Sequence, residues 1–126
     1  MDGKFVPSTS WPYDSESDKN WEDLVNQTEG IPHWQDNTFE VDLMVTDQIG
    51  EAKKWVSAGV GRVIFHVEAL QKIEEEKGEQ SVRAEILKIK EQGIDLSFAL
   101  VPETENSVLD KYLDLAESVQ FMGINK

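Results

Sequence analysis

Phe39-Glu40-Val41-Asp42-Leu43-Met44-Val45 is a short, mainly apolar run of the kind that forms a buried strand. The segment that follows, residues 47–58, has apolar side chains at helical spacing and stops before Gly59, a residue that commonly ends helices. Residues 62–68 form a second strand-like run, Arg-Val-Ile-Phe-His-Val-Glu. A strand, a helix and a further strand in this order predict a β-α-β unit, in which the two strands are parallel.

The same alternation continues toward the end of the chain. Gly78 interrupts a charged stretch, so we expect the next helix mainly after Ser81, with Gly93 at its end. The remaining predicted elements are a strand over residues 94–101, a helix over residues 107–116 and a strand over residues 118–124.

The first part of the chain lacks this regularity. Residues 7–37 are rich in Ser, Pro, Asp, Asn and Trp, and we expect one short helix there, over residues 20–27. We therefore expect a single domain over residues 1–126, with an irregular loop and a short helix in 1–37 and repeated β-α units in 38–126. Periodicity leaves a barrel and a doubly wound sheet open, since these differ in whether the strand order reverses.

The composition argues against several classes of protein. Twelve Lys and Arg against 25 Asp and Glu give a net charge of −13 over 126 residues, which disfavours nucleic-acid and anionic-membrane partners because phosphate attracts basic clusters. The absence of cysteine excludes disulfides and a thiol nucleophile. Neither G-x-G-x-x-G nor G-x-x-x-x-G-K-[ST] occurs, so nucleotide binding through those loops is unsupported. Without a signal segment or a long apolar run, we expect a cytoplasmic protein.

Five segments, in order along the chain, resemble the ribulose-phosphate 3-epimerase family. Met1-Asp2-Gly3-Lys4-Phe5-Val6-Pro7 is similar to the family's M-D-G-x-F-V-P segment, and Asp42-Leu43-Met44-Val45 is similar to its third-strand H-x-M-V. Phe65-His66-Val67-Glu68-Ala69 is similar to the fourth-strand F-H-x-E-A. Phe98-Ala99-Leu100-Val101-Pro102-Glu103-Thr104 resembles L-A-x-x-P-G-T, and Met122-Gly123-Ile124-Asn125 resembles the start of the sixth-strand M-S-V-N.

The resemblance implies an α/β fold: a partial (β/α)8 TIM barrel, covering roughly the end of strand two to strand six. In the family, a divalent metal is held by a His and an Asp of strand two, a His of strand three and an Asp of strand seven. The two Asp residues are the acid–base pair. Of these four positions only the strand-three one falls within the sequence, and it is Asp42. The resemblance thus implies a metal ligand at Asp42 and no catalytic residue within the chain.

Other residues are candidates for contact with substrate or for support of the site. Met1, Met44 and Met122 match methionines around the reacting carbon in the family, which implies substrate binding, whereas two core methionines and an initiator are the alternative. His66 and Glu68 would share one strand face. They either join the site or hydrogen-bond to backbone or to each other and so support the barrel mouth.

A related reaction is disfavoured by one residue. Phosphate-binding barrels that decarboxylate use a D-x-K-x-x-D array on the third strand, and the matching segment here has Met44 in place of the lysine. Without that cation nothing protonates the vinyl carbanion, so we reject decarboxylation.

The implied function is metal-assisted epimerisation of ribulose 5-phosphate to xylulose 5-phosphate, with a sugar phosphate as partner and no nucleic acid or membrane. We expect the isolated segment to be inactive, because the family's catalytic carboxylates and phosphate grip have no match in it. The alternative is a non-catalytic barrel fragment or a self-associating homo-oligomeric module, since an open parallel sheet exposes its edges.

Overall fold

The computed structural model describes residues 36–123, whose strands form one four-stranded sheet. The strands are β1 (Glu40–Asp42), β2 (Arg62–His66), β3 (Asp95–Leu100) and β4 (Ser118–Phe121). They lie in the order β1-β2-β3-β4, and all three neighbouring pairs are parallel. Since this order does not reverse, it is the arrangement of a barrel rather than of a doubly wound sheet. The prediction of parallel strands alternating with helices in a partial (β/α)8 barrel is confirmed.

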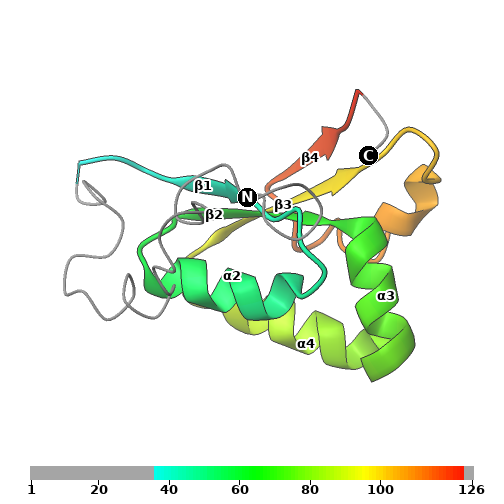
Figure 1. Cartoon of the computed structure of the whole chain (residues 1–126), viewed down its shortest axis with the longest axis horizontal. Helices are drawn as coiled ribbons and strands as arrows, with labels where there is room; N and C mark the ends of the chain where they lie inside the picture. The colour runs from blue at the N-terminus through cyan, green and yellow to red at the C-terminus, as the bar shows by residue number, and fades with distance from the viewer. Residues whose placement is uncertain (1–35, 124–126) are drawn as a thin grey trace, which may run out of the picture.

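Helices cover one face of this sheet. They are α2 (Gln48–Ser57), α3 (Val67–Lys77) and α4 (Glu79–Lys90), and a 3-10 turn, η1 (Asn106–Leu109), follows β3. Figure 1 shows α2, α3 and α4 on the same side of the strands, as right-handed crossovers between sequential parallel strands require. None of the helices in residues 36–123 is long and apolar enough to cross a membrane.

The second strand is shorter than predicted, and a helix replaces the charged stretch behind it. β2 ends at His66 and α3 begins at the next residue, so the prediction that Glu68 lies on the strand is wrong. Val67, Leu70 and Ile73 recur at helical spacing and are buried, and this apolar stripe holds the segment as a helix. Gly78 separates α3 from α4 with a φ of 85°, a conformation open to glycine at little cost, and α4 begins at Glu79 rather than after Ser81.

The helix predicted over residues 107–116 is a 3-10 turn followed by further turns. Leu109, Tyr112 and Leu115 are the buried residues, whereas Leu113 is 49% exposed. A spacing of three suits 3-10 geometry, in which side chains at i and i+3 eclipse. The backbone bonds from Tyr112 N to Leu109 O (2.8 Å) and from Leu115 N to Tyr112 O (2.9 Å) have the same period.

The outer strands also differ from the predicted bounds. β1 covers three residues of the predicted 39–45, and β4 covers the first four of the predicted 118–124. The helix predicted over residues 20–27 lies outside the described residues.

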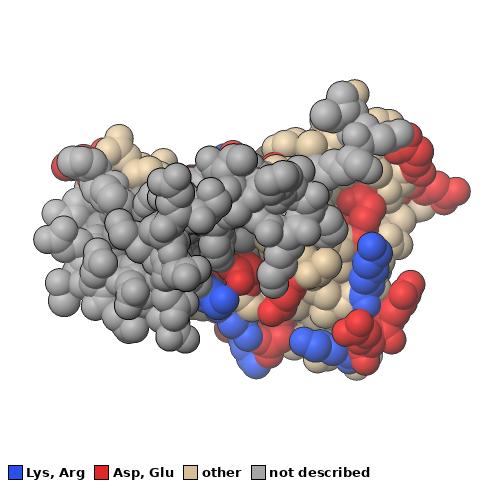
Figure 2. All heavy atoms as spheres, viewed as in Figure 1, with Lys and Arg blue, Asp and Glu red and all other residues tan. Residues whose placement is uncertain are grey.

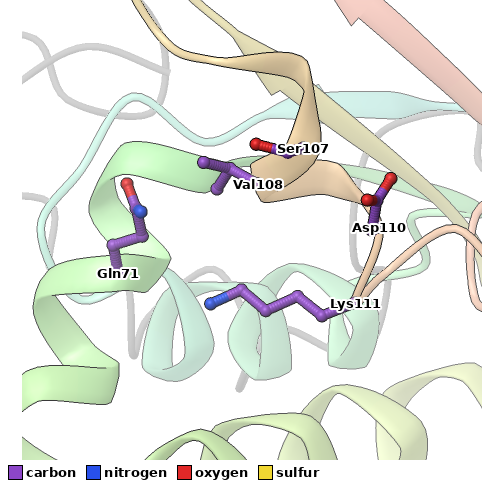
Figure 3. Close-up of a pocket in the computed structure, with 5 residues that line it drawn as sticks. All are labelled: Gln71, Ser107, Val108, Asp110 and Lys111. Carbon is purple, nitrogen blue, oxygen red and sulfur yellow. The ribbon is translucent and has the colours of Figure 1, made fainter.

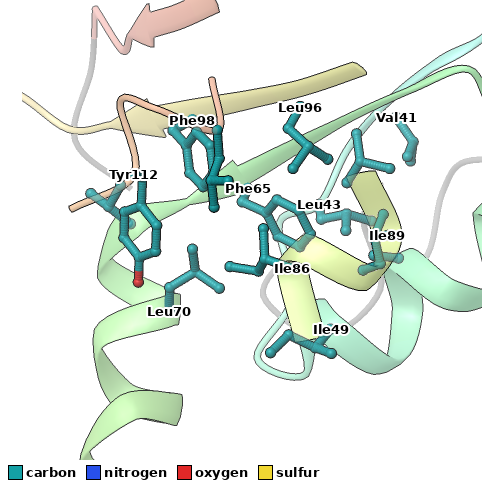
Figure 4. Packing of buried hydrophobic residues seen from close by; sticks show 14 of the residues in the cluster. Val41, Leu43, Ile49, Phe65, Leu70, Ile86, Ile89, Leu96, Phe98 and Tyr112 are labelled. Atoms are coloured by element: carbon teal, nitrogen blue, oxygen red, sulfur yellow. The ribbon is translucent and has the colours of Figure 1, made fainter. Parts of the chain in front are cut away.

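The core lies between the sheet and the helices. Side chains of the strands that point toward α2, α3 and α4 are apolar and almost fully buried, among them Val41, Phe65, Leu96, Phe98 and Leu100. Phe98 lies between the rings of Phe65 and Tyr112 (Figure 4), with its ring centroid 6.0 Å from that of Phe65 and 4.9 Å from that of Tyr112. The Val, Leu and Phe side chains of the strands therefore pack beneath the helices.

Surface ion pairs tie the helices to one another. Lys53 of α2 pairs with Glu85 of α4, whose other carboxylate oxygen accepts from Lys88 at 2.9 Å. Figure 2 shows acidic and basic side chains interspersed around the helices on the face that it displays. The hydrogen bond from Lys53, followed by that from Lys88, lowers the pKa of Glu85 from 4.5 to about 2.

This lowered pKa predicts a pH-dependent difference between the wild type and Glu85→Gln. The ion pairs stabilise the fold above pH 4.5, and their contribution is lost as the pH falls from 4.5 toward 2. At pH 6 and low salt, Glu85→Gln should melt below the wild type, and the difference should shrink steadily between pH 4.5 and pH 2. Thermal unfolding followed by circular dichroism measures both curves, with Glu76→Gln in α3 as the control. A difference of the same size at pH 6 and pH 2 would contradict the assignment.

Candidate functional site

Asp42 and His66 meet at the carboxyl ends of two neighbouring strands. Each is the last residue of its strand, β1 or β2, and strand alternation places both on the face opposite the helices. The His66 Nε2 and Asp42 Oδ1 atoms lie 2.6 Å apart, and the side chains are 6% and 29% exposed. The carboxyl ends of parallel strands are where barrel proteins place their chemistry, so this pair is the centre of the candidate site.

Gln48, which the sequence did not single out, lies directly behind this pair. It is the first residue of α2 and is fully buried. Its amide Nε2 donates to the Leu43 carbonyl at 2.8 Å, and its Oε1 accepts from the His66 backbone N–H at 3.0 Å. Gln48 therefore joins the segment after β1 to the end of β2 through its side-chain amide. The helical periodicity of the sequence does not predict this role, because a polar residue in the first turn of a helix is ordinarily exposed.

Asp47 begins α2 as its N-cap and so places Gln48. The Asp47 Oδ1 accepts from the Gly50 backbone N–H at 3.1 Å, one of the donors that a helix start leaves unpaired. A Cβ at position 50 would clash with this carboxylate, so the glycine gives the cap its space.

Glu68 does not join Asp42 and His66 but binds the loop behind β3. Its Oε1 accepts from the Val101 backbone N–H at 2.9 Å and from the Thr104 hydroxyl at 2.6 Å. One carboxylate in the first turn of α3 thus holds the segment that leaves the carboxyl end of β3. These contacts are to backbone and hydroxyl groups at the mouth of the sheet.

Two of the candidate substrate-binding methionines lie just beyond the two outer strands of the described sheet. Met44 follows β1 and Met122 follows β4, and both are half-buried. Met122 N donates to the Leu100 carbonyl at 2.9 Å, and its sulfur accepts from Gln120 Nε2 at 3.4 Å. β2 and β3 lie between the two residues, and Met1 lies outside the described residues, so contact with substrate stays a prediction for all three.

The donors in the described part of the chain do not make a complete metal site. Asp42 and His66 offer one carboxylate and one imidazole, and these atoms already bond to each other. Within residues 36–123 there is no group of three or more His, Cys, Asp or Glu side chains that could hold a metal ion. Protein metal sites ordinarily use at least three protein ligands. The described residues therefore do not fit a divalent metal by themselves, and the role of Asp42 as ligand stays a prediction.

Both arginines of the described residues are paired with carboxylates away from the Asp42–His66 edge. Arg62 lies at the amino end of β2 and bonds to Glu40 at 3.1 Å and Asp95 at 3.3 Å, and the bond to Glu40, then that to Asp95, raises its pKa. Arg83 pairs with Asp114, which raises the pKa of Arg83. Neither arginine of the described residues is therefore available to bind a phosphate at the carboxyl edge of the sheet.

A shallow hollow between α3 and the segment around η1 is a weaker candidate. It is lined by Gln71, Ser107, Val108, Asp110 and Lys111, which Figure 3 shows around the opening. Lys111, its only cation, pairs with Glu74 and lies 5.4 Å from the centroid of the Tyr112 ring. The Glu74 carboxylate neutralises the positive charge of Lys111, which an anionic ligand would need.

The sequential parallel sheet with its acid–histidine pair at the carboxyl edge defines a protein of the (β/α) barrel class. The model of the ribulose-phosphate 3 epimerase family matches residues 1–126, and the chain belongs to this family. The resemblance found in the sequence is therefore confirmed. No curated protein matches the chain.

The contacts of Glu68 predict a local effect of its removal. In Glu68→Ala the Val101 amide and the Thr104 hydroxyl lose their acceptor, which should cost about 1–3 kcal/mol because a partly buried charged acceptor disappears. Amide hydrogen exchange followed by NMR should show faster exchange at Val101 and its neighbours. Glu75→Ala, one of the exposed glutamates of α3, is the matched control. Equal protection of Val101 in both variants would contradict this role.

Proposed function

We propose that the chain serves the 3-epimerisation of ribulose 5-phosphate to xylulose 5-phosphate, within cytoplasmic carbohydrate metabolism. Membership of the family supports the reaction class. The single observation that carries the proposal is the position of Asp42, 2.6 Å from His66 at the carboxyl edge of the sheet. The resemblance to the family's third-strand ligand position also supports a role for Asp42.

The reaction requires more groups than this edge supplies. A proton is removed from the carbon beside a ketone on one face and returned on the other, which needs a base and an acid on opposite sides of the substrate. Asp42 and His66 lie together on one side. We therefore assign them to holding and orienting, and we propose that the acid–base pair is not among these 126 residues.

A direct assay tests this proposal. The purified 126-residue chain should convert no ribulose 5-phosphate above background, with Mg²⁺, Mn²⁺, Co²⁺ or Zn²⁺ added, because the acid–base pair is missing. Turnover would be measured by a coupled spectrophotometric assay, and Asp42→Asn would be compared with Asp110→Asn, which removes an exposed acid. Turnover lost only in Asp42→Asn would contradict the proposed inactivity and would make Asp42 part of a working site.

A second candidate function, self-association, rests on the outer strand of the described sheet. Phe121 of β4 is 65% exposed, although parallel strands are ordinarily covered on both faces. An outer strand also presents unpaired backbone groups that can accept a further strand. A homo-oligomer formed through β4 would cover both features.

This second candidate predicts a change of mass on substitution. The wild-type chain should sediment as a dimer or larger species. Phe121→Ser should raise the dissociation constant of that oligomer at least tenfold, because the substitution removes the exposed ring from the contact. Leu87→Ser, on the outer side of α4, is the matched control for losing an exposed apolar side chain. A wild type that remains monomeric at the highest soluble concentration would exclude self-association through β4.

A further inference from the structure

The hydrogen-bond ladder between β1 and β2 stops one bond early. In a parallel pair, a residue donates its N–H to one residue of the neighbouring strand and accepts from the residue two positions farther along. Leu43 N donates to the Ile64 carbonyl at 3.1 Å, so the next bond of this ladder would join the Leu43 carbonyl to His66 N–H. The structure replaces that bond.

The side-chain amide of Gln48 stands in its place. Its Nε2 satisfies the Leu43 carbonyl at 2.8 Å, and its Oε1 satisfies the His66 N–H at 3.0 Å. An amide is suited to this insertion because it carries a donor and an acceptor on one planar group. The Leu43 carbonyl and the His66 N–H are thus joined through two hydrogen bonds and an amide group, where a regular ladder would join them by one hydrogen bond of about 2.9 Å.

We propose that Gln48 is the positioning residue of the Asp42–His66 pair. The inserted amide holds the carboxyl ends of β1 and β2 apart at the level where these two side chains face each other. His66 is fixed through its own N–H, and Asp42 is fixed through the carbonyl of the residue that follows it. Removing Gln48 lets the ladder close and moves the carboxylate relative to the imidazole.

The early end of β1 is consistent with this arrangement. A strand was predicted over residues 39–45, yet β1 ends at Asp42, just before the carbonyl that Gln48 takes. Its fully buried amide contacts the carbonyl just beyond β1 and the N–H at the end of β2, and Gln48 acts on the pair through those two backbone groups. The importance of Gln48 for activity rests on the proposed function, whereas its hydrogen bonds to Leu43 and His66 are observed independently of that function.

NMR couplings across hydrogen bonds test the insertion directly. In the wild-type chain, the His66 backbone ¹⁵N should couple to the side-chain ¹³Cδ of Gln48, and the Gln48 Nε2 should couple to the Leu43 carbonyl carbon. In Gln48→Ala, the His66 ¹⁵N coupling should transfer to the Leu43 carbonyl carbon as the ladder closes. The His66 ring N–H resonance, which reports the bond to Asp42, should shift or broaden beyond detection.

A second variant and a control keep the test decisive. Gln48→Glu keeps an acceptor for His66 N–H and has no side-chain nitrogen to donate to Leu43, so only the first coupling should survive. Gln92→Ala, at an exposed amide that bonds to Lys88 O, should change none of these signals. A wild-type coupling from His66 to Leu43, or a His66 ring resonance unchanged in Gln48→Ala, would overturn the proposal. Because no readout involves turnover, failure of the epimerase assay would leave this result intact.

Discussion

Stacking of Phe98 between two other aromatic rings joins the sheet to the chain that follows it. Phe65 belongs to β2, Phe98 to β3 and Tyr112 to the turns before β4, so the stack crosses three consecutive parts of the fold. The Tyr112 hydroxyl bonds to Glu74 of α3, which brings the helix layer into the same unit. Burial, followed by that hydrogen bond, raises the pKa of Tyr112 and keeps the phenol protonated. This apolar contact therefore links β2, β3, the turns before β4 and α3 in one packed unit.

The regular part of the fold could be predicted from the sequence because its signals are local. Apolar alternation in residues 94–101 indicated a strand whose buried face holds Leu96, Phe98 and Leu100, and glycines marked helix ends. The errors fall where the signal is ambiguous. Val67 fits a strand as well as the first turn of a helix, and the period of three in Leu109, Tyr112 and Leu115 resembles helical spacing.

The candidate site was predictable only in its position on the chain. Asp42 and His66 were identified from motifs, but nothing in a linear sequence showed that they bond to each other while Glu68 turns toward the loop after β3. Gln48 was missed altogether, since a glutamine inserted between strands and one exposed to water look the same in sequence. Long-range pairing of polar groups is a property of the folded arrangement, and this limits what residue patterns can predict.

The unreversed order of the strands bears on how the chain assembles. No strand in the described sheet pairs with one that is not its neighbour in sequence, so each pairing needs only the segment synthesised immediately before it. Short loops cost less entropy to close and favour rapid folding. β1 and β2 with α2 can therefore associate while later residues are still within the ribosome. The architecture is compatible with vectorial, cotranslational folding that proceeds one β-α unit at a time from the amino-terminal side.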